Sequence, residues 1–201
     1  MAPTVEELLK DYDFDPSTID RIAFRKYKHP IAIVEPDPTW PEHFARAKAR
    51  IESALGDTAV SINHVGSTSV PGLPAKAVID IDLTVKDIND EASYVQALED
   101  AGFHFLVREP DWHGHRLFCD YEPVPTNLHV WGPDCPEAIR HKIFTDWLRK
   151  NEDDKKLYEN VKRQSAKASI EKGEDVMDYN MRKQSVIREI LQRAFKDLGY
   201  L

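Results

Sequence analysis

Residues 60–85, VSINHVGSTSVPGLPAKAVIDIDLTV, decide the fold of this chain. The second half of this stretch, AVIDIDLTV, is rich in the β-branched residues that favour strands. Because side chains alternate across a strand, Asp80 and Asp82 project from one face, and Ile79, Ile81 and Leu83 fill the other. We therefore expect a strand with one apolar face and two carboxylates ~6–7 Å apart on its polar face.

This pair of carboxylates suits one or two hard cations such as Mg²⁺ or Mn²⁺, which prefer oxygen ligands and keep positions open for phosphate. Upstream, Gly66 and Ser67 follow an apolar run, in a loop whose backbone N–H groups and hydroxyls suit an anion. Alternatively, the acids are solvated on an exposed sheet face and Gly-Ser is only a turn. Because the loop leads from the Gly-Ser turn onto the same strand, we favour a metal-and-phosphate site.

Composition limits the class of protein. The 201 residues suit one sizeable domain, and the proportions of hydrophobic (41%) and charged (31%) residues are ordinary for a globular protein. No apolar run approaches the ~20 residues of a membrane span, and the acidic N-terminus lacks the pattern of a signal peptide. Two cysteines make no disulfide framework. We therefore expect a cytoplasmic protein, and the net charge of −8 disfavours nonspecific binding of nucleic acid.

The chain before this central stretch predicts three elements. Thr4 and Glu7 have the spacing of a capping box for a short helix over residues 5–12. We treat residues 1–30 as an accessory segment without chemistry. Residues 31–35, IAIVE, predict a short strand, and Asp37 or Thr39 begins a helix that Gly56 ends.

After the central stretch the pattern predicts a helix over about 91–101 and then strands at 103–108, 116–122 and 126–132. On the last strand, Asn127 and His129 share a face. If this strand adjoins the one bearing the acids, His129 faces the same side as Asp80 and Asp82. Those carboxylates would then raise the His129 pKa from its reference value of ~6.5. The alternative is an ordinary structural histidine.

From residue 136 onward, apolar residues recur at helical spacing, with Asn151 and Asp175 as helix starts. This helical tail is the most cationic part of the chain. Such charges either form a solvated helix face or close over a polyanionic ligand. The cationic residues are Lys155, Lys156, Lys162, Arg163, Lys167, Arg182, Lys183 and Arg188.

The motif HVGSTSVPGLPAKAVIDIDL resembles the signature of GrpB-like proteins, a family with a nucleotidyltransferase-type fold. EPDPTWPEHF at 35–44, NLHV at 127–130 and FTDWLR at 144–149 support the resemblance, as does Tyr179 followed by Lys183. It implies an α/β (α+β) fold, a mixed β-sheet flanked by helices. Its parts would be an accessory segment (1–30), a nucleotidyltransferase-like core (31–135) and a helical region packed on the core (136–201).

The resemblance also implies a site. In the wider superfamily, a Gly-Ser turn precedes a strand bearing two acids that bind the metal, and a later strand supplies a third acid. Here Asp80 and Asp82 match the acid pair, and His129 stands where the third acid is expected, so we assign these three residues as catalytic. The residues assigned to phosphate or nucleotide are Gly66, Ser67, Thr68, Lys76, Arg116, Tyr179 and Lys183.

Three functions remain open. The leading hypothesis is a nucleotidyltransferase dependent on Mg²⁺ or Mn²⁺ that acts on a nucleoside triphosphate and a small acceptor. In this hypothesis Lys76 and Arg116 neutralise developing charge. The second is a non-catalytic module that binds a nucleotide or phosphorylated metabolite. The third is acyl transfer from an aminoacyl-tRNA, using Ser67 or His129, which the acidic composition disfavours.

Overall fold

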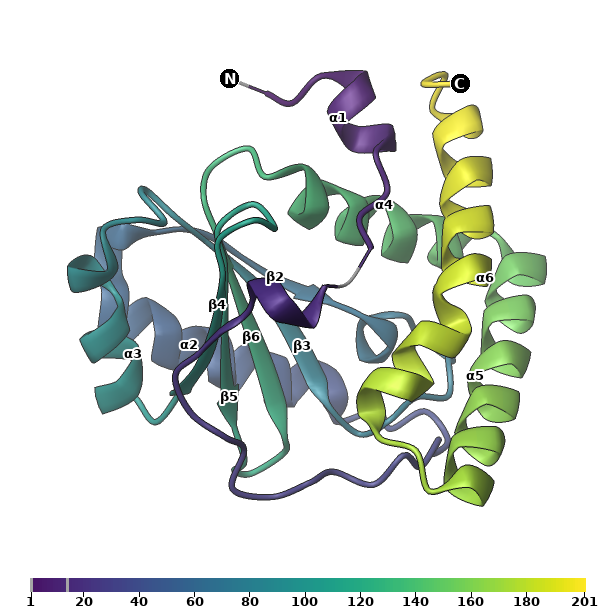
Figure 1. The fold of residues 1–201 in the computed structure, drawn as a ribbon, viewed down its shortest axis with the longest axis horizontal. Coiled ribbons are helices and arrows are strands. Elements are labelled where there is room, and N and C mark those ends of the chain that lie inside the picture. The colour runs from purple at the N-terminus through teal and green to yellow at the C-terminus, as the bar shows by residue number, and fades with distance from the viewer. Residues whose placement is uncertain (1, 14) are drawn as a thin grey trace.

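The computed structural model describes residues 2–13 and 15–201. Within these residues the strands form one six-stranded sheet in the order β1-β4-β5-β6-β3-β2 (Figure 1). The strands are β1 (Asp20–Arg21), β2 (Ala59–Val65), β3 (Ile79–Val85), β4 (His104–Glu109), β5 (His115–Asp120) and β6 (Thr126–Trp131). The α-helices are α1 (Val5–Leu9), α2 (Trp40–Leu55), α3 (Val95–Asp100), α4 (Pro136–Lys150), α5 (Glu152–Lys172) and α6 (Val176–Asp197).

The sheet is mixed, as predicted. Strand β3 pairs in parallel with β6, and the remaining neighbours pair antiparallel. The two strands that carry the predicted site residues, β3 and β6, are therefore direct neighbours.

One face of the sheet carries the main apolar core. Ile79, Ile81 and Leu83 of β3 are fully buried there, and they pack in the same cluster as Ile51 of α2 and Leu98 of α3. Burying such side chains contributes about 1.5–3 kcal/mol each. The alternation predicted for β3 is confirmed, and it leaves the acids on the opposite face.

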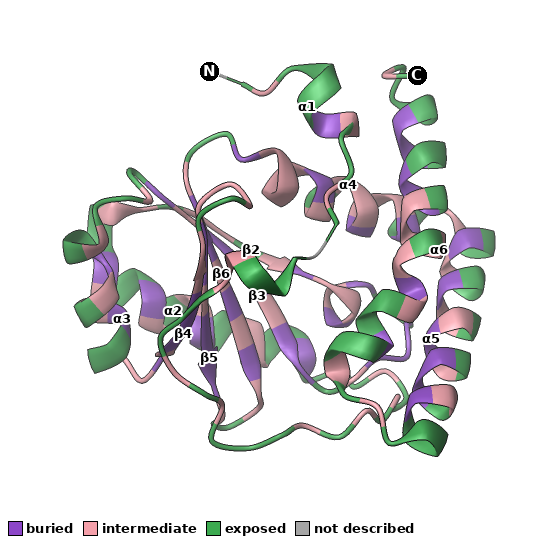
Figure 2. Cartoon of the chain, viewed as in Figure 1, coloured by how far each residue is buried: buried purple, intermediate pink, exposed green. Residues whose placement is uncertain are grey.

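The opposite face is approached by the C-terminal helices and crossed by the N-terminal segment (Figure 1). Leu148 of α4, Tyr158 of α5 and Ile190 of α6 form a second core with Val70 and Leu73 of the loop before β3. Figure 2 shows that α5 and α6 each carry buried residues along one side and exposed residues along the other. This second core fixes the helical tail against the loop that precedes the two acids.

Near β4 and β5, residues from the N-terminal segment complete this face. Ile19 and Ala23 pack against Leu106 and Cys119. The backbone N–H groups of Ile22 and Ala23 both donate to the Leu106 carbonyl. The short strand β1, which the sequence did not predict, extends the sheet at the β4 edge.

Several predicted element boundaries need correction. Residues 31–35 form no strand, because only Val34 pairs, with Ala75, between the flanking Pro30 and Pro36. The helix predicted over 91–101 is a 3₁₀ turn, Glu91–Ser93, followed by α3. The first helix ends at Leu9. In the part of the chain that the structure describes, no helix has both the length and the apolar content of a membrane span.

Candidate functional site

The polar face of β3 and β6 brings the predicted residues together. In the parallel register Asp80 lies opposite Asn127, and Asp82 lies opposite His129. Residues paired in this way point to the same side of a sheet. The Asn127 side-chain amide donates to Asp80 Oδ1 over 2.8 Å. The geometric prediction that His129 faces the same side as both acids is confirmed.

Asp82 lies in a buried ion pair. It is only 2% exposed. Trp131 Nε1 donates to its Oδ1 over 2.9 Å, and His141 Nδ1 of α4 lies 2.9 Å from its Oδ2. Burial favours the uncharged form of each partner, but their mutual attraction outweighs it, so the Asp82 pKa is lowered and the His141 pKa rises to about 9. Both Asp82 oxygens are therefore engaged.

His129 belongs to a chain of hydrogen-bonded side chains. Its Nδ1 lies 2.9 Å from His115 Nε2, and His115 Nδ1 lies 2.6 Å from Glu109 Oε2. Burial, followed by repulsion from His115, lowers the His129 pKa to about 4, although Asp82 and Asp80 act to raise it. The predicted rise in this pKa is wrong, because burial outweighs the two carboxylates.

The Gly-Ser turn lies directly against Asp80. Gly66 has a φ of 67°, and a Cβ atom built on it would lie 2.4 Å from Asp80 Oδ2. The Ser67 side chain lies near the Tyr158 hydroxyl of α5, whose pKa burial raises and Ser67 acts to lower. Thr68 is buried, and its hydroxyl donates to the Val78 carbonyl over 3.1 Å. Thr68 therefore holds the loop closed, whereas Gly66 and Ser67 border the acid.

Lys76 and Lys183 share one aromatic ring. Lys76 lies in the loop before β3, and Lys183 lies on α6 one helical turn after Tyr179. The Lys183 Nζ lies 4.0 Å from the centre of the Tyr179 ring, and the Lys76 Nζ lies 5.0 Å from it. Both distances suit a cation–π interaction. The structure thus brings together three of the predicted phosphate-binding residues.

A second pair of the same kind lies on α5. Lys162 follows Tyr158 by four residues, and its Nζ lies 4.9 Å from the centre of the Tyr158 ring. Lys162 also donates to the Pro74 carbonyl in the loop before β3. Through Tyr158 and its neighbour Ser67, this pair adjoins the Gly-Ser turn. We refer to three residues as the lysine cluster: Lys76, Lys162 and Lys183.

The surroundings of the lysine cluster disfavour the charged form of its ammonium groups. Burial lowers the Lys162 pKa to about 7. Burial, followed by repulsion from Lys76 and Lys162, also lowers the Lys183 pKa to about 7. The Asp80 carboxylate opposes the shift at Lys76 and Lys183 without outweighing burial. A bound anion would restore the charged form of these lysines.

Comparison with known proteins identifies the family. The family model described as GrpB protein matches residues 30–193. The chain belongs to the GrpB family. Over 164 residues this GrpB-family protein is 44% identical to the UPF0157 protein BH1888 of Halalkalibacterium halodurans, and the match spans 82% of each chain.

Two further similarities extend the comparison. A protein of Mycolicibacterium paratuberculosis named dephospho-CoA kinase is 31% identical in an alignment of 192 positions that covers 83% of this chain and 46% of that protein. The crystal structure of the conserved protein GrpB from Enterococcus faecalis matches with a TM-score of 0.73 and 26% identity, over 84% of this chain and 99% of that one. The predicted family and fold are therefore confirmed.

The structure does not bring Arg116 to the GrpB-family site. In the register of β5 and β6, Arg116 pairs with Val130, a residue of the main apolar core. Its guanidinium donates to the Glu91 carboxylate and to the Gly114 carbonyl. Because side chains alternate, Arg116 lies on the face opposite Asp80. This position corrects the prediction that Arg116 contacts phosphate beside the two acids.

Several residues near the site were not assigned from the sequence, among them His115 and His141. Tyr158 was missed and Lys162 was named only among the cationic residues of the tail, although YENVK (158–162) repeats the Tyr-x-x-x-Lys spacing of YNMRK (179–183). Arg25 and His29 were missed because residues 1–30 carry no recognisable motif. The Arg25 Nη2 donates to Asn127 Oδ1 over 2.8 Å, so the N-terminal segment reaches the polar face.

The donor atoms fit a metal ion poorly. Among the described residues, no group of three or more His, Cys, Asp or Glu side chains is arranged to hold one. Both Asp82 oxygens have partners, and His129 Nδ1 is bound to His115. Asp80, with its Oδ1 bound to Asn127, is the more accessible of the two acids. Metal binding by Asp80 and Asp82 stays a prediction.

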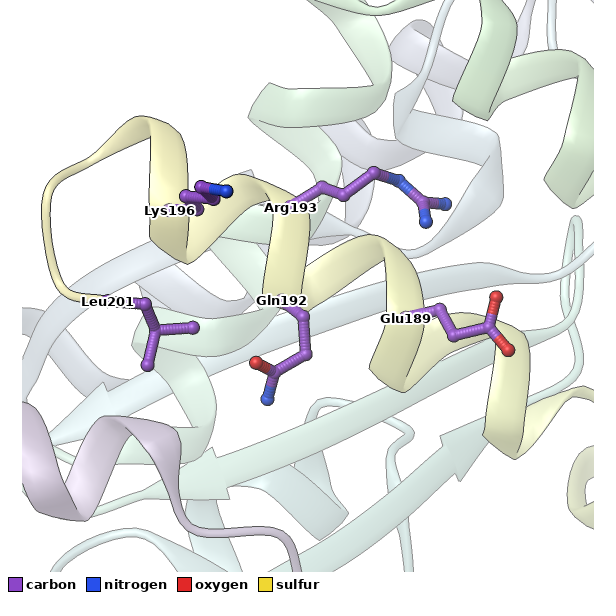
Figure 3. Close-up of a pocket in the computed structure, with 5 residues that line it drawn as sticks. All are labelled: Glu189, Gln192, Arg193, Lys196 and Leu201. Carbon is purple, nitrogen blue, oxygen red and sulfur yellow. The ribbon is translucent and has the colours of Figure 1, made fainter.

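A surface hollow elsewhere on the molecule has no link to these residues. It has a volume of about 340 Å³ and is lined by side chains from the end of α6 and the C-terminus (Figure 3). Its Arg193 is ten residues beyond Lys183, which is about 15 Å along the helix. Arg193 also binds Asp154 through two nitrogen atoms. We therefore assign no role to this hollow.

Proposed function

We propose that this GrpB-family protein binds a phosphorylated small molecule of the nucleotide class, with its phosphate at the lysine cluster. One observation carries the proposal: Lys76, Lys162 and Lys183 converge from three parts of the chain, and the carboxylates near them, Asp80 at Lys76 and Lys183 and Glu159 at Lys162, do not offset the burial of the ammonium groups. Bringing like charges together in a buried place is unfavourable unless an anion compensates them. A phosphate group supplies that compensation.

The remaining side chains suit the same ligand. The Ser67 and Tyr158 hydroxyls and the backbone of the Gly66 turn provide donors beside the lysines. Lysine is a common phosphate-binding residue, acting as a point charge. Relatives named dephospho-CoA kinase contain a region similar to this chain, and in those proteins that name indicates a nucleotide-related ligand. The similarity supports a ligand of that class here.

The test is calorimetry with inorganic phosphate as the probe. Lys183→Met keeps much of the apolar stem but removes the ammonium group, and we expect it to weaken phosphate binding about tenfold or more. Lys196→Met, an exposed position on the same helix, is the matched control and should bind as the wild type does. Equal phosphate affinity in the wild type and Lys183→Met would refute the proposal.

A second candidate is metal-dependent nucleotidyl transfer. It is favoured by the position of Asp80, which lies against the Gly66 turn and two residues before Asp82. This activity predicts pyrophosphate release from a nucleoside triphosphate with Mg²⁺ or Mn²⁺, and its loss in Asp80→Asn. If phosphate binding persists in EDTA and no pyrophosphate is released, the protein is a non-catalytic binding module. Acyl transfer from aminoacyl-tRNA finds less support, because His129 is already bound to His115.

A further inference from the structure

The N-terminal segment before residue 30 lies outside the region that matches the GrpB family model. It nevertheless runs across the polar face of the sheet, as the purple trace in Figure 1 shows. Two contacts fix it there: Arg25 Nη2 donates to Asn127, and the Lys26 backbone N–H donates to the Tyr121 hydroxyl over 2.7 Å. The segment is therefore a fixed neighbour of the residues around Asp80.

Two atoms of this segment are buried without a hydrogen-bond partner among the described residues: Arg25 Nη1 and His29 Nε2. Leaving a buried polar group unpaired costs about 1–3 kcal/mol, and more for a charged group. Such groups are rare in folded proteins and call for an explanation. A ligand that accepts hydrogen bonds from both atoms would explain why neither atom has a partner in the protein.

These two residues adjoin the lysine cluster. Burial lowers the His29 pKa, and the nearby charges of Arg25 and Lys76 lower it further. Arg25 likewise acts on Lys76, which in turn lies over the Tyr179 ring. Lys76 thus has two cationic neighbours, Lys183 of the lysine cluster and the Arg25 guanidinium with its unpaired N–H.

We propose that Arg25 and His29 bind a second anionic group of the ligand whose first phosphate lies at the lysine cluster. The ligand class is then a diphosphate or longer phosphate chain, such as that of a nucleoside diphosphate. A single phosphate group carries at most about two negative charges, fewer than the four cationic side chains that converge here. This inference rests on the proposed function and narrows its ligand class.

The test compares two probes, inorganic phosphate and inorganic pyrophosphate, by calorimetry on the full chain. The wild type should bind pyrophosphate about tenfold or more tightly than phosphate. Arg25→Gln removes the charge but keeps a donor for Asn127, and it should lower pyrophosphate affinity about tenfold with less than about a twofold change for phosphate. Lys28→Gln, an exposed position in the same segment, is the control and should change neither affinity.

A second variant keeps the test decisive if Arg25→Gln disturbs folding. His29→Phe keeps a ring beside Tyr121 but removes Nε2, and it should lower pyrophosphate affinity selectively. If pyrophosphate and phosphate bind equally well, or if both Arg25→Gln and His29→Phe keep the wild-type preference, the inference is overturned. In that case, weaker binding of both probes by Lys183→Met leaves the proposed function standing. If neither probe binds to the wild type, both proposals fail.

Discussion

Among single residues, Gly66 determines the position of the Asp80 carboxylate most directly. Its φ of 67° lies in the left-handed region, where side chains are unfavourable, and its missing side chain leaves the space that Asp80 Oδ2 occupies. Gly72, in the same loop, has a similar φ of 73°, but a Cβ atom added there would meet nothing within 4 Å. The two glycines therefore separate the effect of backbone strain from that of steric overlap.

We expect Gly66→Ala to lower the free energy of unfolding by about 2–4 kcal/mol, from backbone strain and from overlap with Asp80. Gly72→Ala should lower the free energy of unfolding by only about 1–2 kcal/mol, from backbone strain alone. Urea denaturation of both variants and the wild type measures the difference. If the two substitutions cost the same, the close contact between Gly66 and Asp80 does not matter for stability.

At the scale of elements, α5 and α6 contribute equivalent tyrosine–lysine pairs to one place. Tyr158 with Lys162 and Tyr179 with Lys183 each span one helical turn, so each lysine lies near its own tyrosine ring. Packing the two helices against the loop before β3 brings both ammonium groups towards Lys76. The unfavourable clustering of lysine ammonium groups therefore arises from the packing of the two helices, and neither helix shows it alone.

This packing makes stability depend on pH. The Lys183 pKa is about 7 in the fold, well below that of an unfolded lysine, so between about pH 7 and 10 the unfolded chain binds more protons. The free energy of unfolding therefore rises with pH in that window. Lys183→Met removes this contribution. We expect the change that Lys183→Met causes in the free energy of unfolding to be more stabilising at pH 6.5 than at pH 9. The difference should be at least about 1 kcal/mol, since one pKa unit corresponds to about 1.4 kcal/mol.

Urea denaturation of the wild type and Lys183→Met at both pH values checks this expectation. Lys196→Met serves as the control, because it removes the same charge from an exposed position on the same helix. The neighbours that bear on Lys183 are Lys76, Lys162 and Asp80, and all three are unchanged in these variants. An effect of Lys183→Met that is the same at pH 6.5 and pH 9 would contradict a lowered pKa.

Elements also show what the sequence predicts and what it does not. Local patterns predicted correctly the alternation of β3 and the capping box at Thr4, because each depends only on nearby residues. The face of Arg116 depends on the register between β5 and β6, and the His129 pKa depends on burial by the whole fold. Neither quantity is encoded in the spacing of a motif, and both predictions failed.

At the scale of the whole molecule, the candidate site joins three parts of the chain that lie far apart in sequence. Arg25 comes from the N-terminal segment, Asp80 from the sheet and Lys183 from the last helix. The sheet and the helical tail could be predicted from periodicity and from the family motif. The approach of Arg25 could not, because a short segment without a motif is positioned by contacts with distant parts of the chain, such as Asn127 and β4.

A ligand held by all three parts should stabilise the molecule as a unit. At a pyrophosphate concentration of about 100 times Kd, the free energy of unfolding should rise by about 2.7 kcal/mol. For a chain of this size that corresponds to a rise in Tm of roughly 5–10 °C. Thermal unfolding with and without pyrophosphate measures this rise, and hydrogen exchange locates the protection.

Exchange should slow at residues 19–30 and around Lys183, because both would contact the ligand. It should change less in α3, which packs on the opposite face of the sheet and provides an internal control. Protection around Lys183 without protection of residues 19–30 would show that the ligand binds the lysine cluster alone. Equal protection of α3 and the N-terminal segment would instead indicate a general effect of stability, since a bound ligand suppresses global unfolding everywhere. Exchange that slows more in both contacting regions than in α3 supports a ligand that bridges the N-terminal segment and the helical tail.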